Sequence, residues 1–485
     1  MSSDSSSLPL CVDLDGTLVR SDTLHEQLVR AVLARPWALP GLGLSLLSGR
    51  AAFKRKVSTL GQLDPARLPY HEGLVAWLRE EKARGRTLVL ATAADESVAA
   101  SIAAHLGIFD AVVSSNGSHN LKGEHKAERL AERYGKGGFA YAGNSTADIP
   151  VWQHSGQRIL VNTSRRLDAD VARTMEVERR FERGGRGLVR SLIKAIRAYQ
   201  WVKNLLVFLP LLLAHRISDR AALLASLLTF FAFSLTASSI YLVNDLTDLD
   251  SDREHPRKRA RPFASGDLPL SYGFLGPALM IAGLTLAAVF VSIPTLVMLV
   301  IYVVVTTAYS SVLKTKPLID VFTLAGLYTI RLLTGGIAAQ IHVSIWLLGF
   351  SMFAFLSLAF LKRSSELTAA VREALKVNAR RGYRPEDHGL LQVMGVAAAF
   401  LAALILALYL SSPEARAQYR SPMWLWLSVP IVLFAQCRLW LSSARGEMTD
   451  DPIVYAVKDP ASWIAILCLV IVFALATLAP APTWM

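Results

Sequence analysis

Five carboxylates and five basic side chains crowd residues 241–266, YLVNDLTDLDSDREHPRKRARPFASG, directly after more than twenty residues without a charge. If the apolar segment continues as a helix, Asp245, Asp248 and Asp252 fall within about 60° of one another, because each residue turns a helix by about 100°. Three acids on one face repel one another unless a cation lies between them. Oxygen-only ligands favour Mg²⁺, which shares its coordination shell with substrate phosphates. The spacing therefore predicts a magnesium site.

The flanks of this face fit the same chemistry. Asn244 supplies an amide beside the three acids, whereas Asp250 and Glu254 point to the opposite side of the expected helix. Lys258 and Arg261 follow at the distance at which a diphosphate would need neutralising. The alternative is a solvated charged loop, which the spacing and the apolar edge make the weaker interpretation.

A second polar set lies in apolar sequence further along the chain. Asp320 and Arg331 are eleven residues apart, about three helical turns, so they share a face. Arg331 falls at hydrocarbon depth, where a charge is costly and by default functional. We expect Arg331 to be partnered with Asp320 through a shared ligand or with other polar groups, the alternative being a structural ion pair. Tyr309 and Lys314, at the mouth of the same helix pair, are candidates for holding a phosphate.

The composition places these groups in a membrane protein of more than one domain. The chain has 485 residues, too many for one ordinary core, and 53% of them are hydrophobic. The formal net charge is +13, but the basic residues cluster in loops beside apolar blocks. This pattern indicates membrane topology and anionic ligands rather than nucleic acid. The three cysteines show no pairing pattern, which indicates a cytoplasmic soluble part without disulfides.

Nine apolar segments follow residue 200, and most reach the ~20 residues that a spanning helix needs. Loops on one side of nine spans carry 16 Lys and Arg, and those on the other side carry four. The positive-inside rule makes the first set cytoplasmic, together with the N-terminal part and residues 241–266. The first segment is the weakest because it is short and contains a proline. The segments are 200–214, 221–243, 271–292, 294–311, 318–339, 343–361, 390–410, 422–441 and 461–480.

Residues 8–180 have a different pattern. Short apolar runs such as LPLCVDLDG, TLVLATA, FAYAGN and RILVN alternate with helical patterns at 96–106 and 124–134. This alternation predicts a parallel sheet with its ligand site at the carboxyl ends of the strands. We expect an α/β domain over residues 1–180, a basic interfacial helix over 181–203 and a membrane domain over 204–485.

The motif VDLDGTL, which contains Asp13 and Asp15, resembles the first motif of the haloacid-dehalogenase-type hydrolases. LVLATAAD, NLKGEHKAERL and YAGNSTADIPVW follow in the order of that family's remaining motifs, over roughly residues 8–165. The resemblance implies a Rossmann-like fold, with Asp13 as nucleophile and Asp15 as acid and base in phosphoryl transfer. About eighty residues separate Asp13 from Thr92, which leaves room for a small helical cap.

The same resemblance implies that Thr92 and a lysine hold the phosphate, and both Lys122 and Lys126 stand at the expected helix start. Asp148 and Asn144 would complete a Mg²⁺ site with the first two aspartates. Asn144 departs from the family pattern, which has aspartate there, so the alternative is a degenerate domain that binds phosphate without hydrolysis.

NDLTDLDSD resembles the Asn-Asp-x-x-Asp-x-x-x-Asp signature of the UbiA superfamily of intramembrane prenyltransferases, and the likeness covers about residues 195–480. It implies an all-α nine-helix bundle. Aromatic prenyltransferases of this superfamily carry a second aspartate pair after the sixth span, but this chain has FLKRSSEL, with Lys362 and Arg363. Together with QWVKNLLVFLP, which contains Lys203, this resembles the polyprenyl-phosphate phosphoribosyltransferase branch.

That branch implies transfer of phosphoribose from phosphoribosyl diphosphate to a polyprenyl phosphate, with Mg²⁺ on the three aspartates binding the departing diphosphate. We expect the α/β domain to remove the 5-phosphate of the lipid product, and both sites to face the cytoplasm of a bacterial-type inner membrane. One alternative is prenyl transfer from a prenyl diphosphate to an aromatic acceptor of the 4-hydroxybenzoate type. Another is a transporter with a phosphate-binding domain. The sequence predicts no oligomeric state.

Overall fold

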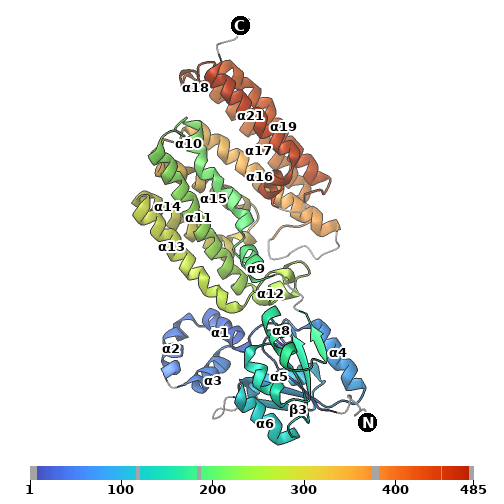
Figure 1. Cartoon of the computed structure of the whole chain (residues 1–485). Helices are drawn as coiled ribbons and strands as arrows, with labels where there is room; N and C mark the ends of the chain where they lie inside the picture. Colours follow the sequence, from blue (N-terminus) through green and yellow to red (C-terminus); the bar gives the residue numbers. More distant parts are fainter. Residues whose placement is uncertain are drawn as a thin grey trace. The chain divides into compact units, whose positions relative to one another are not determined.

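Figure 1 shows the computed structural model of the chain, which describes residues 8–47, 49–115, 121–182, 187–372, 382–448 and 451–479. The chain forms two compact units. The first contains Met1–Ile196 together with Tyr241–Gly276, and the second contains Arg197–Ile240 and Pro277–Met485. The acid-rich segment singled out in the sequence therefore belongs to the same unit as the N-terminal domain.

A six-stranded, wholly parallel sheet forms the centre of the first unit, with strand order β3-β2-β1-β4-β5-β6. The four expected apolar runs are confirmed as β1, β2, β4 and β5. Strands β3 and β6 were not expected, because their apolar runs are short. The strands are β1 Leu10–Val12, β2 Leu88–Asp95, β3 Ala111–Ser115, β4 Ala140–Gly143, β5 Gln157–Val161 and β6 Arg179–Phe181.

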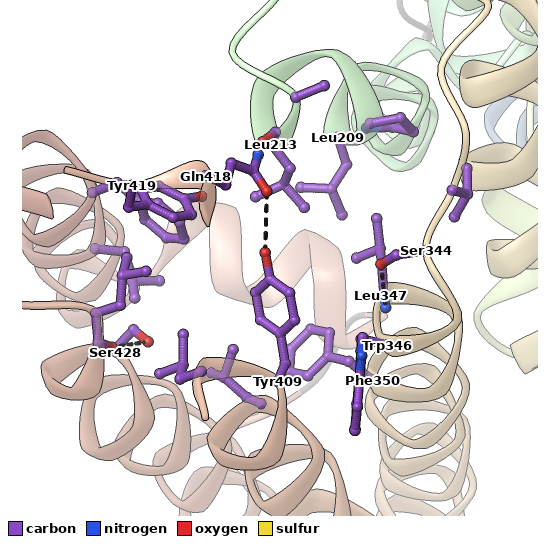
Figure 2. Close-up of a pocket in the computed structure, with 18 of the residues that line it drawn as sticks. Leu209, Leu213, Ser344, Trp346, Leu347, Phe350, Tyr409, Gln418, Tyr419 and Ser428 are labelled. Carbon is purple, nitrogen blue, oxygen red and sulfur yellow. Dashed lines mark hydrogen bonds between the residues drawn. The ribbon is translucent and has the colours of Figure 1, made fainter. Parts of the chain in front are cut away.

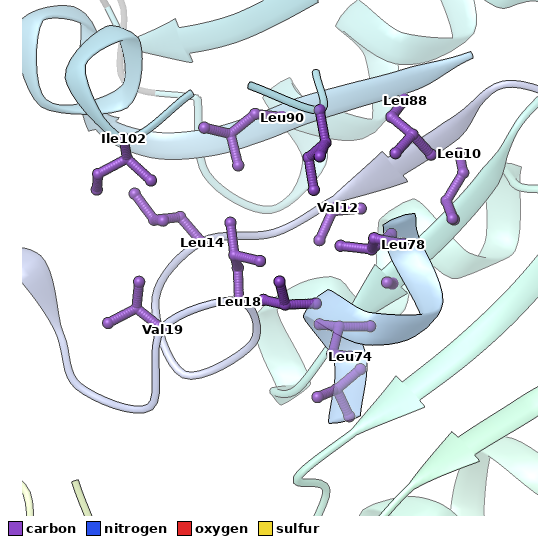
Figure 3. Packing of buried hydrophobic residues seen from close by; sticks show 14 of the residues in the cluster. Leu10, Val12, Leu14, Leu18, Val19, Leu74, Leu78, Leu88, Leu90 and Ile102 are labelled. Atoms are coloured by element: carbon purple, nitrogen blue, oxygen red, sulfur yellow. The ribbon is translucent and has the colours of Figure 1, made fainter. Parts of the chain in front are cut away.

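Alternate residues of each strand serve opposite faces of the sheet, as the pleat requires. Leu10, Val12 and Leu90 pack into one apolar cluster, drawn in Figure 3, while Cys11 and Val89 pack into another. The expected helices 96–106 and 124–134 are confirmed as α5 and α6. The helices that flank the sheet are α4 Glu72–Ala83, α5 Glu96–Leu106, α6 Glu124–Tyr134, α7 Ile149–His154 and α8 Arg165–Thr174.

The expected small helical cap follows β1. It consists of α1 (Thr23–Ala34), the short 3₁₀ turn η1 (Pro36–Ala38), α2 (Leu39–Leu47) and α3 (Arg50–Leu60). Asp22 begins α1 as its N-cap, because its side chain accepts a hydrogen bond from the His25 N–H.

Residues 241–276 contribute the end of α11 (Arg220–Thr247), then α12 (Leu249–Glu254) and two 3₁₀ turns, η5 (Lys258–Ala260) and η6 (Leu270–Phe274). Within the first unit, this segment is held to the cap by ion pairs.

The central pair of these contacts joins Glu26 of α1 to Arg253 of α12. The Arg253 guanidinium donates twice to the Glu26 carboxylate, at 2.5 and 3.1 Å, and Glu26 is 0% exposed. Arg30 of α1 bridges Glu26 and Asp250, at 2.6 and 2.5 Å. A buried carboxylate is stable only when it is paired, so these contacts fix α12 against α1.

The second unit is helical. Eight of the described helices are long and apolar enough to cross a membrane, and the chain is a multi-pass membrane protein. The first of the nine expected spans is instead a shorter apolar stretch, Ala198–Leu213, in agreement with its weak pattern. The candidate spans are Arg220–Thr247 (α11), Leu270–Phe290 (η6 and α13, Leu275–Phe290), Ile293–Ser311 (α14), Ile319–Ala338 (α15), Ile345–Thr368 (within α16, Ile345–Arg372), Asp387–Leu410 (α17), Pro422–Ala444 (ending in α19, Ser428–Ala444) and Pro460–Leu478 (α21).

The expected interfacial helix over 181–203 is shorter in the structure. Helix α9 covers Leu188–Ala195 and leaves Val189 and Ile193 more than half exposed, while the 3₁₀ segment η4 (Ala198–Phe208) follows. Residues 183–186 of the expected helix lie outside the described residues.

Candidate active sites

The carboxyl edge of the sheet brings together residues from three of the predicted motifs. Lys126 of α6 is buried and donates from Nζ to Asp13 Oδ1 at 2.7 Å and to the Tyr141 hydroxyl at 2.9 Å. The Tyr141 hydroxyl donates to Asp148 at 2.8 Å. Of the two lysines left open by the sequence, Lys126 therefore contacts the expected nucleophile, while Lys122 is an exposed residue that lines the adjoining cavity.

Two carboxyl groups at this edge have raised pKa values. Burial raises the pKa of Asp13 to about 6, although the Lys126 ammonium lowers it. Burial, followed by repulsion from Asp22, raises the pKa of Asp15 to about 7, although Asp15 accepts a hydrogen bond from the Thr23 N–H at 2.7 Å. A carboxyl group with a pKa near neutrality can both give and take a proton, as acid–base catalysis requires.

Asp13, Asp15 and Asn144 line a cavity of about 340 Å³, and Asn144 stands close to the backbone of Gly16. Gly16 has φ +76°, and a Cβ there would lie 2.1 Å from Asn144 Nδ2, so only glycine fits. These oxygen donors suit Mg²⁺. Thr92 is buried and accepts from the Ala94 N–H at 3.0 Å, whereas Ala93 and Ala94 themselves line the cavity.

Asp148 also lines this cavity, but both its oxygens accept hydrogen bonds from the protein. Oδ1 accepts from Tyr141, and Oδ2 accepts from the Asn144 and Ser145 N–H groups at 3.0 Å each. Direct coordination of Mg²⁺ by Asp148 stays a prediction.

Two of the three acids expected on one face, Asp245 and Asp252, share a partner in the structure. Helical hydrogen bonds continue from α11 into α12, because the Asp248 N–H donates to Asn244 O and the Asp252 N–H donates to Asp248 O, both at 2.8 Å. Asp245 and Asp252 are 3% and 1% exposed and contact one nitrogen of Arg261, at 3.1 and 2.6 Å.

The two acids expected on the other side of this helix have different partners. Asp250 pairs with Arg30, and Glu254 pairs with Arg67 at 2.9 Å. The periodicity therefore separated Asp245 and Asp252 from Asp250 and Glu254, while the place of Asp248 beside the first two stays a prediction. Lys258 lies in η5, where its charge acts on Asp252.

Asp252 shows why this face suits a cation. Its Oδ1 is buried and has no hydrogen-bond partner among the described residues. Burial raises the pKa of Asp252, although Arg261 lowers it. A metal ion that replaced the Arg261 nitrogen between the carboxylates would satisfy this oxygen. Among the described residues, no three His, Cys, Asp or Glu side chains already converge on one point as a metal site.

In the second unit, Arg331 of α15 is buried among polar and aromatic groups. Its Nε donates to Asn204 Oδ1 at 2.8 Å and its Nη2 donates to the Tyr302 hydroxyl at 3.0 Å. The guanidinium carbon lies 4.8 Å from the centre of the Tyr302 ring, within cation–π distance. These contacts match the expectation that other polar groups partner Arg331.

Asp320, near the start of α15, pairs with Arg363 of α16 instead. Arg363 Nε lies 2.5 Å from Asp320 Oδ2, and the Tyr383 hydroxyl donates to Oδ1 at 2.7 Å. Arg363 also donates to the Tyr309 hydroxyl at 2.7 Å and pairs with Glu366. Arg363 and Tyr309 thus meet, while Lys314 lies in the 3₁₀ turn η7, Leu313–Thr315.

Lys203 and Lys362 converge on Asp451, at 2.7 and 2.9 Å from the same carboxylate oxygen. Asp451 begins α20 (Pro452–Lys458) as its N-cap, and its side chain is only 7% exposed. Burial opposes ionisation, but the lysines hold the pKa of Asp451 well below its ordinary value. Two ammonium groups on one carboxylate leave a net positive charge that suits an anionic ligand.

Sequence reasoning did not single out Asp451, Asn204, Tyr302 or Tyr141. Asp451 stands in the acidic stretch TDDPIVYAVKDPAS, and an aspartate before proline is a typical helix N-cap, which was the available signal. The two tyrosines and the asparagine carried no local signal, since their roles depend on contacts between distant segments.

A cavity of about 410 Å³ with mostly apolar walls lies between α10 (Leu209–Leu213), α16, α17, α19 and α21 (Figure 2). Tyr409 and Gln418 are hydrogen-bonded at its wall at 3.3 Å, and Gln418 also donates to the Leu213 carbonyl at 2.6 Å. Its size and lining suit part of an apolar chain.

Comparison with known families agrees with this arrangement. Residues 205–457 match the UbiA prenyltransferase family, and residues 10–153 match the haloacid dehalogenase-like hydrolases. The chain belongs to the UbiA prenyltransferase family. It carries a haloacid dehalogenase-like domain at its N-terminus, and both domains are of enzyme families.

Two relatives and one solved structure show what this UbiA-family chain is similar to. The uncharacterized protein y4nM of Sinorhizobium fredii is 36% identical over 463 residues, 94% of this chain and 88% of that protein. A decaprenyl-phosphate phosphoribosyltransferase of Mycolicibacterium smegmatis is 37% identical over 200 residues, 40% of this chain and 62% of that enzyme. A UbiA homolog from Archaeoglobus fulgidus, solved with GPP and Mg²⁺, is 16% identical, with 59% of this chain and 99% of that chain covered and a TM-score of 0.45.

Proposed function

We propose that the UbiA domain transfers 5-phosphoribose from phosphoribosyl diphosphate to a polyprenyl phosphate, and that the N-terminal domain removes the 5-phosphate from the lipid product. The observation that carries the first half is the pair of lysines, Lys203 and Lys362, on the Asp451 carboxylate, together with the 37% identity to a phosphoribosyltransferase. A site with excess positive charge suits an acceptor that is itself a phosphate.

In the transfer step, the bond between ribose C1 and the diphosphate oxygen breaks, and diphosphate leaves with the electron pair. An oxygen of the lipid phosphate forms the new bond to C1. Asp245, Asp248 and Asp252, flanked by Asn244, would hold Mg²⁺, which would supply positive charge to stabilise the departing diphosphate. The acceptor is already anionic, so the step needs no general base.

Basic side chains of the chain then position the remaining anionic groups. Lys258 and Arg261 would neutralise the diphosphate once Arg261 leaves the carboxylates. Lys203, Lys362 and Arg331 would hold the lipid phosphate or the ribose 5-phosphate, with Arg363, Asp320, Tyr309 and Lys314 as further contributors. Such catalysis consists of positioning and charge stabilisation. The cavity of Figure 2 would hold part of the polyprenyl chain.

In the hydrolytic step, a carboxylate oxygen of Asp13 attacks the phosphorus of the ribose 5-phosphate, and Asp15 gives its proton to the leaving ribose oxygen. Asp15, now ionised, takes a proton from the water that hydrolyses the aspartyl-phosphate. Lys126 neutralises the phosphate and orients Asp13. Asn144 and the two aspartates would hold Mg²⁺ while Asp148 orients the loop, and Thr92 and Lys122 complete the phosphate site.

The charge asymmetry of the loops supports an orientation with both sites on the cytoplasmic side of a bacterial inner membrane.

Purified full-length protein in lipid nanodiscs tests this function. Labelled phosphoribosyl diphosphate and polyprenyl phosphate should yield a labelled lipid with Mg²⁺ and none after chelation. Asp248→Asn should abolish transfer, whereas the matched variant Asp250→Asn, which changes an acid on the opposite side of α12, should keep it.

The Asp13→Asn variant should retain transfer and accumulate the phosphorylated lipid. Release of only phosphorylated lipid by the wild type would contradict the phosphatase role. Label incorporation from a prenyl diphosphate into an aromatic acid, with none from phosphoribosyl diphosphate, would instead establish ordinary prenyl transfer.

A further inference from the structure

The cap of the N-terminal domain has an apolar outer surface that the phosphatase chemistry does not use. Four large hydrophobic side chains in and beside η1 and α2 are exposed: Leu33 (44%), Trp37 (76%), Leu44 (65%) and Leu47 (86%). Single exposed leucines are ordinary on a protein surface. Four large exposed hydrophobic side chains within fifteen residues, on a domain that has its own hydrophobic core, indicate a surface that a membrane or another molecule covers.

Helix α2 has two distinct faces. Leu42 and Ser45 are buried, at 2% and 9% exposure, whereas Leu44 and Leu47 point outward. Each pair is spaced by three residues and so shares one side of the helix. The exposed leucines are therefore not a remnant of imperfect packing, since the opposite side of the same helix already faces the domain.

The charged residues of the segment that carries this surface are of one sign. Residues 27–63 contain six Lys and Arg and no Asp or Glu. Arg35, Arg55 and Lys56 are exposed. A segment that combines an exposed tryptophan, exposed leucines and cations with no acid matches the composition of segments that lie in the interface of an anionic bilayer.

The first unit also places the cap close to the ends of membrane spans. Arg20 pairs with Asp267 at 2.6 Å, three residues before Leu270, where a candidate span begins. Glu26 and Arg30 of α1 bind α12, which follows the end of the span Arg220–Thr247. Since α1 leads directly into Trp37 and α2, the apolar surface follows a helix that is paired with segments adjoining two candidate spans.

The inner side of the cap faces the catalytic cavity. Thr23, Leu24 and Gln27 of α1 and Lys54 of α3 line the cavity that contains Asp13 and Asp15. One small cap thus has a cavity on one side and an apolar, basic surface on another.

We propose that Trp37, Leu44 and Leu47 insert into the interface of a bilayer that contains anionic lipids, so that the cap collects a phosphate carried by a membrane lipid. The choice of a lipid-borne substrate rests on the proposed phosphatase function, whereas the membrane contact does not.

The test uses the full chain in nanodiscs. Cys437 and Cys468 are replaced by serine, the buried Cys11 is kept, and a fluorophore is attached through Leu47→Cys. The matched control is Glu132→Cys on α6, whose side chain is 68% exposed. The Leu47 label should be quenched by nitroxide lipids and shielded from aqueous iodide, more strongly with phosphatidylglycerol than with phosphatidylcholine alone, and the Glu132 label should show the reverse.

Equal quenching of both labels by iodide would overturn the proposal. Shielding from both quenchers, with a disulfide cross-link between two Leu47→Cys chains, would also overturn it and would assign the surface to a second copy. A Leu44→Glu, Leu47→Glu double variant should hydrolyse a small soluble phosphoester at the wild-type rate and lose hydrolysis of the phosphorylated lipid. If the wild type hydrolyses neither substrate, the phosphatase function fails while the quenching result still decides the membrane contact.

Discussion

Replacing Arg253 with methionine tests how firmly α12 is held by the N-terminal domain. The change keeps the apolar length of the side chain but removes the guanidinium that donates twice to the fully buried Glu26. Breaking a buried ion pair from one side costs about 3–5 kcal/mol, because the remaining charge stays buried. Arg30 still donates to Glu26, so we expect the lower end, about 3 kcal/mol.

Hydrogen exchange of the full-length protein in detergent measures this cost locally. If opening of α12 requires that the pair breaks, 3 kcal/mol corresponds to about 100-fold faster exchange of amides in Leu249–Glu254. Glu254→Gln is the matched control on the same helix, because it removes the exposed pair with Arg67. Exposed pairs contribute at most about 1 kcal/mol, so exchange should rise less than about fivefold.

A double-mutant cycle separates the pair from general damage to α12. Glu26→Gln combined with Arg253→Met should cost little more than Arg253→Met alone, since the second change removes the charge that was left unpaired. If Arg253→Met exchanged within about fivefold of the wild type, or if the two costs simply added, the pair would not be what fixes α12.

Three further outcomes are expected. Burial raises the pKa of Glu26, but Arg253 and Arg30 lower it by more, so that the pKa lies below its ordinary value of 4.5. The protection of the α12 amides, corrected for intrinsic exchange, should therefore stay constant above pH 4.5 and decline as the pH falls through the lowered pKa. A decline between pH 7 and 5 would contradict this. Arg261→Gln removes the cation that competes with a metal for the carboxylates of Asp245 and Asp252. Mn²⁺, measured by electron paramagnetic resonance, should therefore bind more tightly, while the KM for the diphosphate substrate should rise. Unchanged Mn²⁺ affinity would exclude a metal site on these carboxylates. Asp451→Asn leaves the ammonium groups of Lys203 and Lys362 without their shared carboxylate. The thermal unfolding temperature should fall by a shift equivalent to about 3 kcal/mol. The control Asp219→Asn, which weakens the more exposed pair with Arg216, should leave this temperature unchanged.

The residues that the sequence located correctly are those with a local pattern. Alternating strand residues such as Leu10 and Val12, and the helical spacing that separates Asp245 and Asp252 from Asp250, depend only on backbone geometry. The sequence did not predict strand β6 (Arg179–Phe181), because it is a three-residue edge strand with two exposed arginines. It did not predict β3 because the apolar run of that strand is short.

Contacts between distant segments had no such pattern. Glu26 and Arg253 are 227 positions apart, and each looks like an ordinary surface charge in its own helix. Arg331 could be singled out because a charge in an apolar run is rare. Its partners Asn204 and Tyr302 could not, since neutral polar residues are common in apolar helical segments.

The inclusion of Tyr241–Gly276 in the first unit bears on how the protein can be cut into parts. A fragment that ends at Ile196 would keep the whole sheet and the cap but expose Glu26 and Arg30 without Arg253 and Asp250. Such a fragment would expose to solvent the surface of α1 that Arg253 and Asp250 normally cover. We expect it to aggregate or to bind basic helices of other proteins. The segment Tyr241–Gly276 thus joins the N-terminal domain to the spanning helices, and a recombinant form of the haloacid dehalogenase-like domain would have to include this segment.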